Sequence, residues 1–355
     1  MKRIAVVTCH KDPDYVRART LRAGVAALPD VELIVIKNRL RSPLRFPEIW
    51  FRIIVARLRY RPQLYILTFR GYETLFPLLV LGWPTPVIFD EFVNAFAWFV
   101  DEHQKPFSKS WPSRLLQRFY DWQLRRCRAL LTDTPGSAKT SSIKSGVPLS
   151  HYYPIVVSAD ESLFKPMSVK RSGDFRVFFY GNMIPLHGLP FVLDAAVLLK
   201  DAPIIFQVVG GGASTVKLIR ETEVKGAHIE YSPWINFDKL PAAIAKADLC
   251  LGGPFGGTGQ AKTVITGKTY QFLAMARPVL VGDNPETSRY FVDHKNGLVV
   301  DRADAKGLAA SIGWAFKHPQ ELQKIGSNGR QLYTNEFSVD CVTKLLSEML
   351  KQLQL

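Results

Sequence analysis

The sequence predicts an α/β protein built from two doubly wound domains that face a central cleft. Short apolar runs alternate with longer amphipathic segments along the chain, as in parallel sheets whose strands are joined by helices. The alternation stops at residues 156–174, which are polar and lack a sustained period, and then starts again. A chain of 355 residues also exceeds what one hydrophobic core usually serves. We therefore expect domains at 1–165 and 166–335, with 336–355 a C-terminal helix that packs back on the first domain.

The pattern assigns the elements in order. In the first half, apolar runs predict strands at 3–8, 32–36, 64–68, 86–90, 129–133 and 150–155. Helical periodicity between them is clearest at 15–28, 48–60, 112–127 and 136–145. In the second half, strands are expected at 175–181, 204–210, 228–233, 248–253, 278–283 and 297–301. From residue 303 to the end the pattern is helical.

Composition excludes several classes of protein. The four cysteines are scattered without metal-ligand spacing, which favours a reducing cytosol over a disulfide or zinc framework. The longest apolar stretch, residues 75–83, is too short to span a bilayer, and we expect a cytoplasmic protein with no transmembrane helix. The net charge is +15, and residues 1–168 hold 25 of the 46 basic but only 14 of the 31 acidic residues. A basic first half suggests an anionic partner.

Glycine-rich loops follow the strands of the second half, where ligands of such sheets bind. These loops lie in FFYGNMIPLHG (178–188), VVGGGAST (208–215) and GGPFGGTGQAKTVITGK (252–268). Glycine lets a ligand approach the backbone, and a helix N-terminus offers free N–H groups to phosphate. The P-loop and dinucleotide fingerprints are missing, so a P-loop kinase or an ordinary dehydrogenase is disfavoured. DPD (12–14) is read as a turn rather than a metal site.

The second half resembles the donor-binding domain of GT-B glycosyltransferases, most closely the large retaining family 4. The segments that carry the resemblance are FFYGNMIPLHGLPFVLDAAVLLK, VVGGGAST, ADLCLGGPFGG, VITGKTYQFLAMARPVLVGD and HKNGLVV, in the family's order and spacing. The resemblance spans most of 129–301, and it implies two Rossmann-like domains, a nucleotide-diphosphate sugar as donor substrate, and no metal or other cofactor.

Carried over by position, the resemblance implies a set of donor-binding residues. They are Gly181, Asn182, His187, Gly188, Gly211, Trp234, Ile235, Phe255, Gly256, Lys262, Thr263, Lys268 and Gln271. Several positions depart from the family, among them Thr263, which stands where the first of two paired glutamates usually falls. Asn182 and His187 stand where Arg and Lys usually neutralise the diphosphate, and Gln271 stands where a Glu usually holds the ribose hydroxyls. Lys262 and Lys268 are close enough in sequence to replace part of the missing charge.

The acceptor side is expected in the first domain, because a retaining transferase needs little beyond positioning and stabilisation of the leaving diphosphate. Asp90 and Glu91 end a predicted strand, and they are candidates for contacting or deprotonating the acceptor hydroxyl. A structural charge pair at a helix N-terminus is the alternative. His103 lies nearby in sequence and is a third catalytic candidate, with a surface histidine as its alternative.

A basic amphipathic segment at 40–62 suggests an anionic membrane surface as a further partner. Trp50, Arg52, Arg59 and Arg61 are the predicted membrane-facing residues, and a lipid-linked or cell-envelope glycan acceptor would follow, with the protein peripheral on the inner face of the membrane. The alternative is that the apolar stripe covers the sheet. No motif supports a nucleic-acid partner. Two other functions stay open: a catalytically degenerate sugar-nucleotide-binding subunit, and a sugar-nucleotide epimerase, for which no clear carboxylate pair is found.

Overall fold

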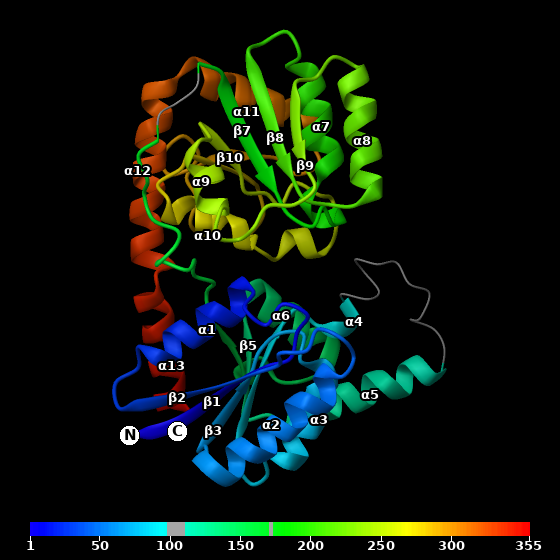
Figure 1. Ribbon diagram of the computed structural model, residues 1–355, viewed down its shortest axis with the longest axis vertical. Coiled ribbons are helices and arrows are strands. Elements are labelled where there is room, and N and C mark those ends of the chain that lie inside the picture. Colours follow the sequence, from blue (N-terminus) through cyan, green and yellow to red (C-terminus); the bar gives the residue numbers. More distant parts are fainter. Residues whose placement is uncertain (98–110, 170–172) are drawn as a thin grey trace. The chain divides into compact units, whose positions relative to one another are not determined.

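The computed structural model describes residues 1–97, 111–169 and 173–355, and these fold as two compact units. Unit 1 comprises Met1–Ser158 and Phe337–Leu355, and unit 2 comprises Ala159–Glu336. Each unit is a six-stranded parallel sheet with helices on both faces (Figure 1). The predicted pair of doubly wound α/β units is confirmed, including a strand at each of the twelve expected positions.

The sheet of unit 1 has the strand order β2-β1-β3-β4-β5-β6. Its strands are β1 (Lys2–Thr8), β2 (Val31–Lys37), β3 (Leu64–Leu67), β4 (Val87–Phe92), β5 (Ala129–Thr132) and β6 (Tyr152–Pro154). Successive side chains of a strand point to opposite faces, so Ala5 and Val7 of β1 join one core while Ile4 and Val6 join the other. Burial on both faces explains why the strands read as continuous apolar runs.

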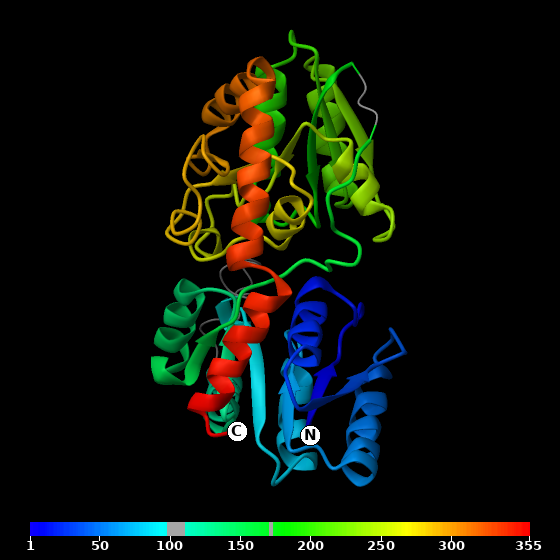
Figure 2. The ribbon, with the colours of Figure 1, turned by 90° about the vertical axis from the view of Figure 1, so that its left-hand side faces the viewer.

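Different helices cover the two faces of this sheet. The helices of unit 1 are α1 (Val16–Ala26), α2 (Arg45–Tyr60), α3 (Tyr72–Leu81), α4 (Ala95–Ala97), α5 (Trp111–Arg126), α6 (Pro135–Ser145) and α13 (Val339–Gln352), with a 3₁₀ turn, η3, at Leu149–His151. Helices α2, α3 and α5 contribute to one core, and α1 and α13 contribute to the other. Both α1 and α13 lie in front of the sheet in Figure 2.

The C-terminal helix is held to α1 at close range. A Cβ atom on Gly24 of α1 would lie 2.5 Å from Cγ1 of Val342 and 2.9 Å from Cδ1 of Leu346, both on α13. Only a residue without a side chain therefore allows the two helices to approach this closely. The Ser338 side chain caps α13 by accepting a hydrogen bond from the Cys341 N–H at 3.4 Å. The last helix of the chain thus belongs to unit 1, although it follows unit 2 in sequence.

Unit 2 repeats the architecture with the strand order β12-β11-β10-β7-β8-β9. Its strands are β7 (Phe175–Tyr180), β8 (Ile204–Val209), β9 (Ile229–Ser232), β10 (Leu249–Leu251), β11 (Val279–Gly282) and β12 (Leu298–Val300). Its helices are α7 (Leu189–Leu198), α8 (Ala213–Val224), α9 (Leu240–Ala245), α10 (Gly267–Ala274), α11 (Ala305–Lys317) and α12 (Pro319–Glu336), with short 3₁₀ turns η4 (Pro185–His187) and η5 (Gln260–Lys262). The central strands β7 and β10 place their carboxyl ends beside the longest glycine-rich loop.

Two features of the described residues bear on function. The apolar stretch 75–83 belongs mostly to α3, a ten-residue helix, and no helix among the residues that the structure describes is long and apolar enough to cross a membrane. Those same ranges contain no group of three or more His, Cys, Asp or Glu side chains arranged to hold a metal ion.

Candidate donor-binding site

Three polar side chains gather at the carboxyl end of β7 in unit 2, and each meets one of the strand's last residues or the glycine that follows. Lys268 Nζ lies 4.4 Å from the centre of the Phe179 ring. The Tyr180 hydroxyl donates a hydrogen bond to Oε1 of Gln271. The imidazole of His187 packs against Gly181, where a Cβ atom would lie 2.7 Å from the ring. The sequence-predicted residues 181, 187, 268 and 271 are therefore brought together.

Each of these side chains contains a buried polar atom that lacks a hydrogen-bond partner in the described part of the chain. Lys268 Nζ, Gln271 Nε2 and His187 Nδ1 are all shielded from solvent and make no hydrogen bond to a described residue. An unmade hydrogen bond at a buried polar group costs about 1–3 kcal/mol. Two of the three groups, the amine and the amide N–H₂, are hydrogen-bond donors. The cluster can therefore hold a ligand that is rich in acceptor oxygens.

Burial sets the protonation of the cluster. Lys268 is only 5% exposed and forms no ion pair with a described residue, and burial lowers its pKa to about 7. The pKa of His187 lies well below its usual value because of burial and, secondarily, the nearby Lys268 charge. Lys268 lies in the first turn of α10, where free backbone N–H groups also favour an anion. A bound anion would restore the charged form of the lysine.

The glycine-rich loops pack backbone to backbone around this cluster. A Cβ atom on Gly188 would lie 2.5 Å from the carbonyl carbon of Phe255, and one on Gly256 would lie 2.2 Å from the Pro185 oxygen. Phe255 itself is fully buried. Gly188 and Gly211 both have positive φ angles, 70° and 85°, which favour glycine. These four predicted residues shape the loops, and Phe255 presents no exposed surface to a ligand.

The remaining predicted donor residues lie at the surface of unit 2. Lys262 and Asn182 are exposed, and the Thr263 hydroxyl donates to the Gln260 oxygen at 3.2 Å. Trp234, which follows β9, is 75% exposed, and Ile235 is half-buried. A large exposed indole beyond the carboxyl end of a strand is suitably placed for stacking on a flat ring. None of these side chains joins the buried cluster.

The acceptor candidates lie at the carboxyl end of β4 in unit 1, and both are fully buried. Asp90 accepts hydrogen bonds from the Arg17 guanidinium, with Nη2–Oδ1 at 2.8 Å. Glu91 accepts from Asn94 Nδ2 at 2.8 Å and from the Tyr120 hydroxyl at 3.0 Å, and burial raises the pKa of Glu91 to about 7. Asp90 is thus committed to an ion pair. His103 falls outside the described residues.

Sequence reasoning missed two residues beside Asp90. Arg17 was read only as part of an amphipathic helix, yet it is 2% exposed and binds the Asp90 carboxylate. Asp133 follows β5 and is also 2% exposed, and burial raises its pKa to about 7. Its position directly after the apolar run ALLT was the signal that could have identified it, because polar residues at the carboxyl ends of parallel strands often line sites.

The predicted membrane-facing segment forms α2 and divides between core and surface. Ile53 is buried against the sheet, whereas Phe51, Ile54 and Leu58 are 66%, 40% and 74% exposed. Trp50 is 36% exposed, and Arg52 is ion-paired with Glu48 at 2.8 Å. Arg59 and Arg61 are exposed. The helix therefore covers the sheet with one apolar stripe and presents a second apolar stripe to solvent.

Comparison with known proteins identifies unit 2. Residues 174–318 match the family model described as "Glycosyl transferases group 1". The chain carries a group 1 glycosyltransferase domain. This match confirms the predicted relationship to glycosyltransferase family 4, and the matched range contains all the predicted donor-binding residues of this glycosyltransferase domain.

Curated relatives match parts of the chain. An MMP alpha-(1->4)-mannosyltransferase from Mycolicibacterium hassiacum is 25% identical over 245 residues, 64% of this chain and 56% of that protein. A protein of Escherichia coli K12 named as a colanic acid biosynthesis glycosyl transferase, WcaI, is 30% identical over 100 residues, 28% of this chain and 24% of its own length. The chain thus spans about half the length of the mannosyltransferase and about a quarter of the length of WcaI.

Solved structures establish the overall fold. Anabaena Alr3699/HepE, solved in complex with UDP-glucose, superposes with a TM-score of 0.70 at 13% identity, covering 99% of this chain and 100% of that one. At this identity the likeness concerns the fold, and it confirms the predicted GT-B architecture.

Proposed function

We propose that the protein transfers a sugar from a nucleotide-diphosphate sugar to a hydroxyl acceptor with retention of configuration. In this reaction the acceptor oxygen bonds to the anomeric carbon, the bond from that carbon to the diphosphate breaks, and the acceptor proton leaves with the diphosphate or a base. The observation that carries the proposal is the cluster of Lys268, Gln271 and His187 at the carboxyl end of β7, each with a buried polar atom that has no hydrogen-bond partner among the described residues. Membership of the matched domain in a glycosyltransferase family supports it.

The cluster would act on the leaving diphosphate. The Lys268 ammonium and the N–H groups of the first turn of α10 would neutralise charge that develops as the glycosidic bond breaks. Because Lys268 lies in a water-poor environment, its interaction with a phosphate oxygen is stronger than at a surface. Trp234 and Ile235 would contact the base, and Lys262 would add a second cation at the rim. The donor needs no metal in this scheme.

A catalytically degenerate sugar-nucleotide-binding subunit is the second candidate. One observation favours it: Oε1 of Gln271, the atom that would accept a ribose hydroxyl, already accepts from the Tyr180 hydroxyl. That bond occupies one of the two lone pairs of the oxygen, and the amide carries no charge, so the ribose hydroxyls would be held more weakly than by a glutamate.

A donor panel separates these two functions. Incubating the protein with UDP-, GDP- and dTDP-sugars and with hydroxyl acceptors, lipid-linked ones included, measures both hydrolysis and transfer. Transfer from at least one donor supports the glycosyltransferase. Tight nucleotide-sugar binding without any turnover would instead support the degenerate subunit, and no binding at all would contradict both.

We further propose that the acceptor is presented at an anionic membrane, where the protein is peripheral. The exposed stripe of α2, formed by Phe51, Ile54 and Leu58, supports this, together with the exposed Arg59 and Arg61 on the same segment. Replacing Arg59 and Arg61 with Glu should weaken binding to vesicles that contain phosphatidylglycerol, with the circular dichroism spectrum unchanged. Equal vesicle binding by the variant would refute this part of the proposal.

A further inference from the structure

Unit 1 contains a pocket of about 430 Å³ at the amino ends of β4, β5 and β6. Val87 begins β4, while Arg128 and His151 directly precede β5 and β6. The volume lies within the range of small-molecule pockets, about 300–1,000 Å³. Asp90 and Glu91 belong to the other end of β4, so the pocket is distinct from the acceptor candidates of this unit. Nothing in the proposed sugar transfer uses it.

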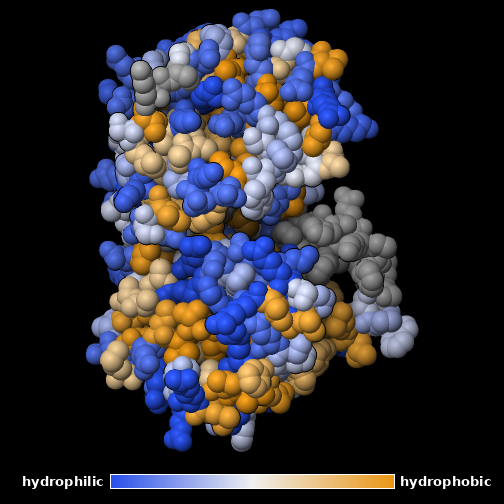
Figure 3. All heavy atoms as spheres, viewed as in Figure 1, coloured by the Kyte–Doolittle hydropathy of each residue, from blue (hydrophilic) through white to orange (hydrophobic). Residues whose placement is uncertain are grey.

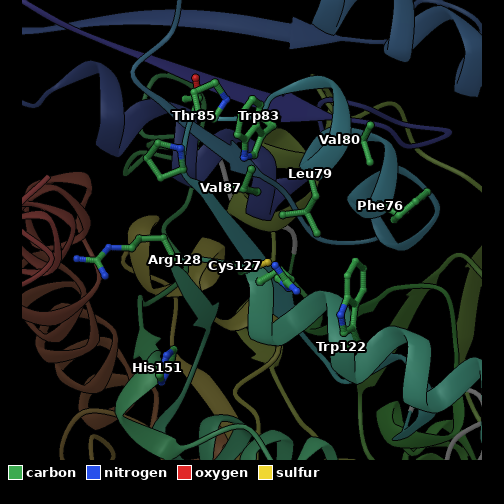
Figure 4. A pocket seen from close by; sticks show the side chains of 13 residues that line it. Phe76, Leu79, Val80, Trp83, Thr85, Val87, Trp122, Cys127, Arg128 and His151 are labelled. Carbon is green, nitrogen blue, oxygen red and sulfur yellow. The ribbon is translucent and has the colours of Figure 1, made fainter.

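Apolar side chains from α3, α5 and the turn before β4 form one side of this pocket. Figure 4 shows Phe76, Val80 and Trp122 on that side, with Trp83 beside them. The rings of Phe76 and Trp122 lie 6.4 Å apart between centroids, and both side chains are 41% exposed. Trp83 is 71% exposed. A patch of large exposed apolar side chains on a folded unit marks a binding surface.

Basic side chains also line this pocket. Arg128 and His151 lie across the pocket from the aromatic residues in Figure 4, and the Arg128 side chain extends away from those residues, with Nη2 donating to the Leu353 backbone oxygen at 2.7 Å. Arg126 lies on the aromatic side, with its guanidinium 5.2 Å from the Trp122 ring centre. All three basic side chains are exposed, and no carboxylate is among the described residues that line the pocket. A guanidinium binds phosphate oxygens in a fork geometry, so the charge of these side chains is complementary to a phosphate.

The pocket continues into a wider apolar and basic surface of unit 1. Helix α5 exposes Leu115, Leu116 and Phe119, and α3 packs against α2, whose Phe51 and Leu58 are exposed. Figure 3 shows apolar residues gathered over α2 and α3 of this unit. Besides the apolar residues, α5 carries four arginines and a single acidic residue, Asp121. Aromatic and aliphatic side chains among arginines are typical of surfaces that enter the headgroup region of an anionic bilayer.

We propose that this pocket binds an acidic phospholipid of a bilayer, with an acyl chain against Phe76, Trp83 and Trp122 and the phosphate at Arg126 and Arg128. The inference rests on the membrane association proposed above, and it names the lipid class and the site that would select it. A pocket lined both by large apolar side chains and by guanidinium groups matches the acyl chain and the phosphate of such a lipid. The lipid here is an anchor, because the pocket is at the opposite edge of the sheet from the acceptor candidates.

The test uses the full chain and sedimentation with vesicles of phosphatidylglycerol and phosphatidylcholine, or of phosphatidylcholine alone, at low ionic strength. The variant R126E/R128E changes two exposed side chains. A basic residue near an anionic surface contributes about a factor of five to partitioning, so we expect roughly a 30-fold loss or more on the mixed vesicles. The control R220E/K225E makes the same change in net charge at two exposed residues of unit 2, and its binding to the mixed vesicles should fall far less.

A second measurement reports on the acyl chain. Phosphatidylglycerol with brominated chains should quench tryptophan fluorescence of the wild type, and W122F should lose part of that quenching while it still binds the vesicles. Equal losses of vesicle binding in R126E/R128E and R220E/K225E, or unchanged quenching in W122F, would refute lipid binding in this pocket. Either result would leave the proposed membrane association intact. If the wild type binds no phosphatidylglycerol vesicles, both membrane proposals fail, and sugar transfer to a soluble acceptor remains a separate test.

Discussion

Replacing Lys268 with Met should stabilise the ligand-free protein, because the lysine is buried with no counter-ion among the residues that the structure describes. Burial lowers its pKa from 10.5 to about 7. Between these two values the unfolded chain binds more protons than the folded one, so wild-type stability rises with pH in this range. Below pH 7 the lysine is charged in both the folded and the unfolded chain, so folding bears the whole cost of burying the charge. At about 1.4 kcal/mol per unit of pKa shift, this cost is at most about 5 kcal/mol. Methionine has a similar length and carries no charge.

The pH dependence distinguishes this reasoning from a simple packing effect. The free energy of unfolding, measured with denaturant, should be higher in Lys268→Met than in wild type by up to about 5 kcal/mol near pH 6 and by about 1.4 kcal/mol near pH 9.5. Lys262→Met is the matched control, since that lysine is exposed, and its effect should stay within about 0.5 kcal/mol at both pH values. A difference for Lys268→Met that is independent of pH, or a destabilisation near pH 6, would refute the reasoning.

Substitutions at three further positions test other parts of the structure. Gln271→Glu should keep or tighten nucleotide-sugar binding by restoring a charged acceptor, whereas Gln271→Leu should weaken it, by roughly 1–2 kcal/mol; calorimetry showing neither change would remove Gln271 from the site. Arg17→Met should lower the free energy of unfolding by about 3–5 kcal/mol at neutral pH, because Asp90 is left buried and unpaired, and a loss below about 1 kcal/mol in denaturant titrations would contradict the ion pair seen here. Gly24→Val should destabilise unit 1 by about 1–3 kcal/mol, since its side chain would collide with Val342, and an unchanged melting temperature would show that α13 does not pack this closely.

The fold could be predicted because it depends on periodicity. Strands buried on both faces of a parallel sheet give short continuous apolar runs, and the run from Ile4 to Val7 supplies both cores of unit 1. Helix α3 was not predicted as a helix, because its apolar residues nearly fill the sequence and leave little amphipathic period.

The candidate site could be predicted only in part. The family resemblance placed Lys268 and Gln271 among the donor-binding residues, but it could not show that both are buried, because burial depends on the packing of β7 and two loops. The partner of Gln271 is Tyr180, which is 91 positions away in sequence. The role of Asp90 was likewise hidden, since its ion-pair partner Arg17 comes from a distant helix. Long-range pairing of this kind leaves no local pattern.

The most direct test of the donor site is calorimetric titration of UDP-, GDP- and dTDP-sugars into wild type and Lys268→Met near pH 8.5, in two buffers of different ionisation enthalpy. The account predicts that the preferred donor binds wild type with uptake of roughly one proton, because a bound diphosphate restores the charge of Lys268. In Lys268→Met the uptake should vanish and the affinity should fall at least about tenfold. Equal affinity for the two proteins, with no proton uptake by either, would contradict the placement of the diphosphate at the start of α10.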